Sequence, residues 1–318
     1  MTTPEQVGNV VQERQAGLWS DAWVRLRANK VAVVGIWLLL FTVALALIGP
    51  FLTPYDFLSQ SVDGRNAGPS MVHWLGTDDL GRDVLARIIY GARTALFIAV
   101  VVTAISSVVG ALLGAIAGFN GGPLDKVIMW FADVTMSIPG LLLVIVINTS
   151  LSPPLVAWMD DMYRTTGDAV YRNTALIDFV LVFGAMALIS WPPYCRLVRA
   201  QVLTIRNSNY VTAARSIGLS SSAIIRRYVL PNALGPFIVA VSAGLGSAMV
   251  LESAFSFLGV GVRPPMPSWG NMIADGLRVW RNYPHLLAAP AIILAIATIA
   301  FSFVGDGLND ALNPKGRK

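Results

Sequence analysis

The chain contains 318 residues, of which 55% are apolar and only 13% are Asp, Glu, Lys or Arg. That charged fraction is about half of the roughly 25% usual in soluble domains, which excludes a disordered chain and argues against a soluble globular one. The net charge of +5 indicates a nucleic-acid partner only if basic residues cluster on a polar face. The single cysteine, Cys195, excludes an intrachain disulfide and a CxxC metal site.

Six long stretches contain no Asp, Glu, Lys or Arg. They are residues 31–55, 94–124, 134–159, 179–195, 228–251 and 282–305. A helix needs about 20 apolar residues to cross the hydrocarbon core, and lipid admits only helices or closed barrels, whose strands would alternate in polarity. The stretches do not alternate, so the sequence predicts an all-α, polytopic membrane protein with six transmembrane helices.

Residues 1–30 are predicted to form a cytoplasmic, interfacial N-terminal segment, with a transmembrane domain over 31–318. Trp19 and Trp23 lie one helical turn apart and precede Arg25, Arg27 and Lys30, an arrangement typical of anchoring among lipid headgroups. The first apolar stretch begins late and has its only A-x-A match inside the stretch, so a retained span is favoured over a cleaved signal peptide.

Residues 73–93 include Thr77, Asp78 and Asp79, which resemble the cap and acidic first turn of a helix that continues as LGRDVLARIIYG. Asp83 and Arg87 are spaced as an i,i+4 pair on that helix. We expect it to lie at the outer membrane surface and to lead into the second span; docking of an extracytoplasmic binding protein is the alternative.

In the second span, Gly110, Gly114 and Gly118 form a small-residue face suited to close helix packing.

The cytoplasmic loop, about residues 194–233, contains six arginines and no acid, and it is the strongest indicator of orientation. With both termini also cytoplasmic, 14 of the 23 basic residues lie inside. SNYVTAARSIG reads as a short helix that Gly218 ends, and SSSAIIRRYVL reads as a second one that ends at Pro231. This hairpin suits either a partner subunit or an anionic lipid surface.

Glu252 ends the fifth span and opens a Gly- and Pro-rich outer loop. Ionisable groups at membrane depth are functional candidates, so we expect the stretch from Glu252 to Gly261 to line an outer gate. Phe255, Phe257 and Leu258 would seal it. The alternative places Glu252 in water at the interface. Asp133 and Asp178 lie near the ends of spans and are interpreted as interfacial or capping residues rather than proton carriers.

The cytoplasmic loop resembles the signature of ABC-importer permeases, E-A-A, three residues, G, nine residues, I-x-L-P. The matching residues are Ala213, Ala214, Gly218, Leu230 and Pro231, whereas Thr212 replaces the usual Glu and Tyr228 the usual Ile. HWLGTDDLGRDVLARIIYGAR, GGPLDKVIMWFADVTMSIPGLLL, SAFSFLGVGVRPPMPSWGNMIADG and FVGDGLNDALNP resemble the dipeptide and oligopeptide subgroup in the same order. Residues 1–30 and about 150–175 lie outside the resemblance.

The resemblance implies a type I ABC-importer permease in the bacterial cytoplasmic membrane, which imports dipeptides or short oligopeptides by alternating access. Its partners would be a second permease, two ATP-binding subunits, an extracytoplasmic binding protein and membrane lipid, without nucleic acid. The chain has no phosphate-binding GxxxxGK[ST] loop, so it is expected to bind no cofactor itself, to catalyse no reaction and to use ATP only through those partners. Ala213, Ala214, Arg215 and Gly218 are expected to couple the ATPases to the spans.

Two alternatives from other classes remain. A proton-coupled secondary transporter or channel acting alone would need a relay of acids inside the spans, and only Asp133, Asp178 and Glu252 are available at their ends. A membrane enzyme would need a catalytic constellation, and neither HExxH nor GxSxG occurs. Nickel chelates, glutathione and haem are the substrate alternatives within the resembling subgroup.

Overall fold

Six helices long and apolar enough to cross a membrane are present in the computed structural model, which describes residues 18–62, 64–172, 175–206 and 208–312. They are Lys30–Leu47, Val84–Asn120, Gly140–Thr166, Phe179–Ile205, Leu234–Phe257 and Pro284–Leu312. Each predicted charge-free stretch corresponds to one of them. The described residues form no β-strand beyond an isolated bridge between Thr77 and Asp83, so the predicted all-α membrane fold is confirmed.

The two ends of the described chain pack against each other. Helix α1 (Leu18–Ala28) places Ala22 and Leu26 against α2 (Lys30–Leu47) and the end of α12 (Pro284–Leu312). Asn29 caps α2 by accepting from Val31 and Ala32, and its amide donates to Asp310 at 3.2 Å. Trp23 is half exposed and lies beneath the guanidinium of Arg27; its interfacial role stays a prediction.

The centre of the bundle is the pair formed by α4 (Val84–Asn120) and α7 (Ala175–Ile205). A Cβ added at Gly110, Gly114 or Gly118 would lie within 3 Å of α7 atoms, so the predicted small-residue face packs within this chain. The large apolar core continues from this pair to α10 (Leu230–Phe257) and includes Ile98, Met186, Met249 and Phe255. A pair of helices in such close contact forms a rigid centre.

The expected start of the second span is wrong, and so is the expected ion pair on it. No helix begins at Asp78 or Asp79; α4 begins at Val84, and Asp83 is its cap because Asp83 Oδ1 accepts from Ala86 N–H at 2.7 Å. Asp83 also contacts His73, while Arg87 pairs with Asp78, so the predicted pair of Asp83 with Arg87 does not form. A single helix of 37 residues takes the place of a surface helix followed by a span.

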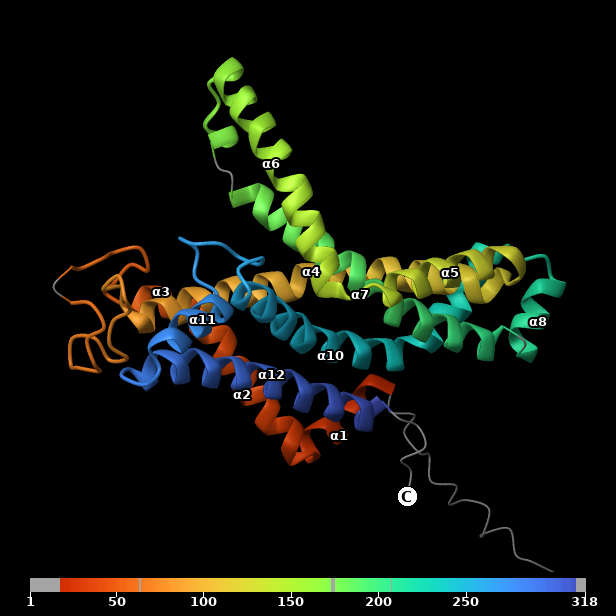
Figure 1. The fold of residues 1–318 in the computed structure, drawn as a ribbon. Coiled ribbons are helices and arrows are strands. Elements are labelled where there is room, and N and C mark those ends of the chain that lie inside the picture. Colours follow the sequence, from red (N-terminus) through yellow and green to blue (C-terminus); the bar gives the residue numbers. More distant parts are fainter. Residues whose placement is uncertain (1–17, 63, 173–174, 207, 313–318) are drawn as a thin grey trace, which may run out of the picture.

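The third span is the second half of a broken helix. Helix α5 (Gly122–Ser137) ends before Pro139, and α6 (Gly140–Thr166) starts immediately after it. Figure 1 shows α6, the short helix η2 (Ala169–Arg172) and the start of α7 projecting away from the other helices. We call these parts the arm; a small cluster of Met159, Ile177 and Leu181 holds it together.

The first helix of the predicted hairpin is α8 (Asn209–Ser216), and the second begins as α9 (Ser221–Ile224). The second helix does not end at Pro231 as predicted, because the π-helix η3 (Ile225–Val229) joins α9 directly to α10. In Figure 1, α8 lies at one end of the bundle, which we call the α8 end. The loop before α4, together with α3 (Gly49–Leu52) and α11 (Trp269–Val279), lies at the opposite end, the α11 end.

Candidate functional site

Among the described side chains, helix α8 buries one face against this chain. Val211 and Ala214 are buried in a cluster with residues of α4 and α7 and with Ile224. Ala213, Ile217 and Gly218 are exposed, Ile217 to 77%, and we call these three residues the docking face. The expected coupling residues are therefore divided, because Ala214 anchors the helix while Ala213 and Gly218 remain accessible. The side chain of Arg215 lies outside the described residues.

The end of α8 is shaped by Gly218. Its φ of +82° is left-handed, and Leu219 N–H donates to the carbonyl of Ala214 across it at 3.1 Å. No atom lies within 4 Å of a Cβ built on Gly218. Thr212, which stands where the resembling family usually has Glu, donates its hydroxyl to the carbonyl of Ser208 at the start of α8. The side chains of Leu230 and Pro231 lie outside the described residues.

Glu252 is fully buried, and its carboxylate accepts hydrogen bonds from three serines. Ser256 and Ser268 donate at 2.6 and 2.7 Å, and Ser253 at 3.3 Å. Ser256 in turn accepts from Val262 N–H, and Ser268 caps α11. Glu252 therefore organises the loop between α10 and α11, and it does not lie in water at the interface.

The remaining residues of the predicted gate lie at two depths. Phe255 is 1% exposed in the core, whereas Phe257 and Leu258 are 39% and 53% exposed. The gate stays a prediction, and only Phe257 and Leu258 present surface to a passage or a partner.

A groove of about 580 Å³ lies between α10 and the helices on either side of the α5 to α6 break. Its walls include Thr103 of α4, Thr135 of α5, Tyr194 of α7 and Ser247 of α10, together with apolar residues. Within the described part of the chain, no charged residue lines it. A concave, mostly apolar site of this size with a few polar groups is typical of small-molecule binding.

Ion pairs fasten α5 to α7 beside this groove. The guanidinium of Arg199 donates two hydrogen bonds, of 2.5 and 2.6 Å, to the carboxylate of Asp125. Arg196 forms an ion pair with Asp133. The hydrogen bond from Arg199 lowers the pKa of Asp125 below its usual value. Asp133, which was interpreted as an interfacial or capping residue, forms this ion pair. The side chain of Asp178 lies outside the described residues.

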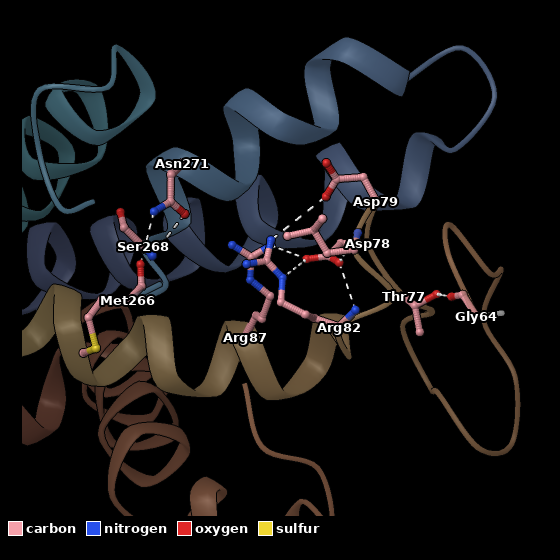
Figure 2. A network of polar contacts seen from close by, with 10 residues as sticks. Gly64, Thr77, Asp78, Asp79, Arg82, Arg87, Met266, Ser268 and Asn271 are labelled. Carbon is pink, nitrogen blue, oxygen red and sulfur yellow. Dashed lines mark hydrogen bonds and ion pairs between the residues drawn. The ribbon is translucent and has the colours of Figure 1, made fainter. Parts of the chain in front are cut away.

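A buried polar network lies at the α11 end. Figure 2 shows Arg82 and Arg87 meeting at the carboxylate of Asp78, with Asp79 more distant. Asp78 also accepts from the backbone N–H groups of Leu80 and Arg82. Burial raises the pKa of the nearby Asp275, and Arg87 opposes that shift. The network ties the loop before α4 to the start of α4.

Sequence reasoning missed the groove and this network. The groove joins residues from α4, α5, α6, α7 and α10, so no local spacing indicates it. The run from Asp78 to Arg87 did contain the charges of the network, but the i,i+4 rule chose the wrong acid for Arg87 because it assumed a helix through Asp83. The only available signal was the alternative i,i+4 spacing of Asp78 and Arg82, which the structure uses without a helix.

Comparison with known proteins places the chain among transport proteins. The family model "Binding-protein-dependent transport system inner membrane component" matches residues 110–318. A second model, "N-terminal TM domain of oligopeptide transport permease C", matches residues 17–69.

The similar proteins extend over almost the whole chain. The oligopeptide transport system permease protein OppC of Bacillus subtilis (strain 168) is 35% identical, covering 97% of this chain and 93% of the relative. The dipeptide transport system permease protein DppC of the same organism is 38% identical, covering 94% of this chain and 86% of the relative. The glutathione transport system permease protein GsiD of Pectobacterium atrosepticum is 33% identical, covering 93% and 91%.

Proposed function

Because this chain belongs to the family of inner-membrane components of binding-protein-dependent transport systems, we propose that it is one of two pore-forming permeases in an ATP-driven importer of dipeptides or short oligopeptides. The relatives that carry peptides support the substrate class. Glutathione, itself a short peptide, is the second candidate because of the glutathione permease among the relatives. A self-sufficient proton-coupled transporter finds no support in this family.

The docking face is the observation that carries the proposal. A helix pinned to α4 and α7 by Val211 and Ala214 transmits force to those helices, while Ala213, Ile217 and Gly218 stay available to another subunit. Small side chains let a second backbone approach closely. ATP-driven closure of two ATPases would move this helix as a rigid body and alternate access to the groove.

The proposed arrangement in the membrane follows from the same helix. The α8 end, which carries α8 and both described chain ends, faces the cytoplasm of a bacterium, where ATP is available. The α11 end faces outward, toward a binding protein that delivers the peptide. The 14 to nine distribution of basic residues supports this orientation.

The first experiment is purification in mild detergent. A complex of this chain with a second permease and two ATPases, whose ATPase activity rises with peptide-loaded binding protein, is expected. An active chain that purifies alone would contradict the proposal.

A pair of glycine variants tests the docking face. Gly218→Val and Gly167→Val both place a β-branched residue at a left-handed φ, +82° and +69°, with nothing within 4 Å of the new Cβ. Both therefore carry a similar backbone strain of about 1–2 kcal/mol. We expect only Gly218→Val to lose the ATPases and stimulated ATP hydrolysis. Equal behaviour of the two variants would remove Gly218 from the coupling role.

A further inference from the structure

A second concave site, of about 710 Å³, lies between α2 and α4 and extends to residues of α7 and of the loops at the α11 end. We call it the α2–α4 cleft, and it shares no lining residue with the groove described above. We propose that this cleft binds an anionic phospholipid, with the guanidinium of Arg93 at the lipid phosphate and an acyl chain along α4.

The cleft has the depth of one leaflet. On α4 it is lined by Tyr90, Arg93, Phe97 and Val100, whose spacing of three or four residues places them on one face of the helix. At about 1.5 Å per residue this strip extends for about 15 Å. That length is about half of the roughly 30 Å of hydrocarbon in a bilayer, so an acyl chain that follows α4 spans the depth that the cleft offers.

Arg93 lies at the mouth of the cleft. It immediately precedes the charge-free stretch that begins at residue 94, which places it where headgroups meet hydrocarbon. Its guanidinium carbon lies 5.9 Å from the centre of the Tyr90 ring, and that ring packs at 4.5 Å on the ring of Phe57. A cation over an aromatic ring is attracted to it, so the two rings hold the guanidinium at the end of the cleft nearest the loops.

The charge of Arg93 is not compensated within the described part of the chain. Arg87, two turns earlier on α4, pairs with Asp78, whereas Arg93 is exposed and pairs with no described acid. No acid lines the cleft, and the hydroxyl of Thr94 in its wall donates to the carbonyl of Tyr90 at 3.2 Å. The cleft therefore offers a planar, phosphate-binding cation at one end and apolar walls beyond it.

A phospholipid combines the two groups that this cleft accepts. Phe97 and Val100 are 58% and 55% exposed, so the apolar wall is open along one side. Lipid tails are as apolar as that wall, so packing against it places the chain without selecting the lipid. Selection comes from Arg93, which favours phosphatidylglycerol, with its net negative charge, over phosphatidylcholine, whose choline compensates the phosphate.

The test uses the full-length chain, with the subunits that purify with it, in vesicles of equal parts phosphatidylglycerol and phosphatidylcholine. One of the two lipids carries a photoreactive diazirine in an acyl chain, and peptide mass spectrometry gives the share of all crosslinks on the chain that fall on cleft residues. Arg93→Gln is compared with Arg281→Gln, the matched control. Arg281 is also exposed, lies over Trp280 at 6.0 Å and does not line the cleft.

We expect the share for phosphatidylglycerol to exceed that for phosphatidylcholine about fivefold in the wild type, the effect of about 1 kcal/mol from one basic residue at an anionic surface. The ratio should persist in Arg281→Gln and fall toward one in Arg93→Gln. Adding inorganic phosphate at constant ionic strength should leave it unchanged.

A second pair of variants tests the place of the acyl chain. Val100→Trp fills the cleft and should lower the share of cleft crosslinks for both lipids. Val108→Trp is the matched control, because Val108 is 56% exposed on the same helix and does not line the cleft.

Four results would overturn the inference. An unchanged ratio in Arg93→Gln would show that Arg93 does not select the lipid, and equal shares in the two tryptophan variants would show that no chain lies in the cleft. Displacement of the lipid by inorganic phosphate would make a soluble anion the ligand. A wild-type cleft without crosslinks to either lipid would show that a protein segment covers it. None of these measurements depends on transport, so they test the cleft separately from the proposed function.

Discussion

Asp78 is the residue on which the α11 end depends most directly. Its carboxylate neutralises Arg82 and Arg87, and all three side chains are at most 8% exposed. Removing one member of a buried ion pair is far more costly than removing the whole pair, because the remaining charge stays buried without compensation.

We therefore predict that Asp78→Asn destabilises the protein by about 3–5 kcal/mol. The matched control is Asp79→Asn, because Asp79 is 57% exposed and 4.0 Å from Arg82; a surface pair contributes at most about 1 kcal/mol. The free energy of unfolding in detergent measures both. A difference below about 1 kcal/mol between the variants would show that Asp78 does not compensate the arginines.

At the same scale, Glu252 shows what a sequence can and cannot predict about a site. Its position at the end of a span made it a functional candidate. Its burial was not predictable, because the serines around it stand at positions 253, 256 and 268 and meet only after the loop folds back onto α11. Phe257 and Leu258 were predicted as gate residues by the same reasoning, and they remain exposed.

At the scale of elements, the contact of α4 with α7 depends on glycine. We predict that Gly114→Ala destabilises the protein by about 1–3 kcal/mol, because the added Cβ would collide with the carbonyl of Cys195. Gly184→Ala, on α7 with nothing within 4 Å, should be neutral or stabilising by up to about 1 kcal/mol. The measurement is the unfolding midpoint of each variant. Equal midpoints for Gly114→Ala and Gly184→Ala would contradict the close packing of α4 on α7.

The contact of α5 with α7 is predicted to weaken in acid. The folded state lowers the pKa of Asp125 through Arg199, so its contribution to stability is present above the unfolded pKa of about 3.9 and is lost as the pH falls through the lower folded value. Hydrogen exchange of α5 should be steady from pH 7 to 5, after correction for intrinsic rates, and rise below about pH 4. In Asp125→Asn the protection should be weaker and independent of this titration; an unchanged acid response would exclude Asp125 as its source.

Element boundaries were the weaker part of what the sequence predicted. The absence of charge located the six spans, since charge is costly in lipid. The absence of charge could not locate the start of α4, which Asp83 caps six residues after the expected cap, Thr77. It also could not show that α9, η3 and α10 follow one another without a break. Both depend on backbone hydrogen bonds that charge counting does not detect.

At the scale of the whole molecule, the proposed orientation is open to a direct test. Val170 on the arm and Ile217 on the docking face are 59% and 77% exposed, while the native Cys195 is buried. In cells that make this chain without the ATP-binding subunits, we predict that a membrane-impermeant maleimide labels Val170→Cys but not Ile217→Cys while the cells are intact, and labels both after permeabilisation. Labelling of only Ile217→Cys on intact cells would reverse the orientation.

The global arrangement also explains why the groove could not be foreseen. The order of the spans and the polarity of the loops follow from the residues in chain order, so the sequence predicts them. The groove arises where α10 passes the break at Pro139 and the prolines of α7, three features that together are spread over about a hundred residues of the sequence. These segments lie next to one another only in the folded protein, where α4 packs on α7.

The length of α4 has a mechanical consequence. At about 1.5 Å per residue its 37 residues extend for roughly 55 Å, well beyond the roughly 30 Å of hydrocarbon. Locked to α7 along its three glycines, it acts as a lever rather than a flexible rod. A change in tilt of about 5° at the α8 end would displace the Val84 end by roughly 5 Å, a distance comparable to the width of an extended peptide.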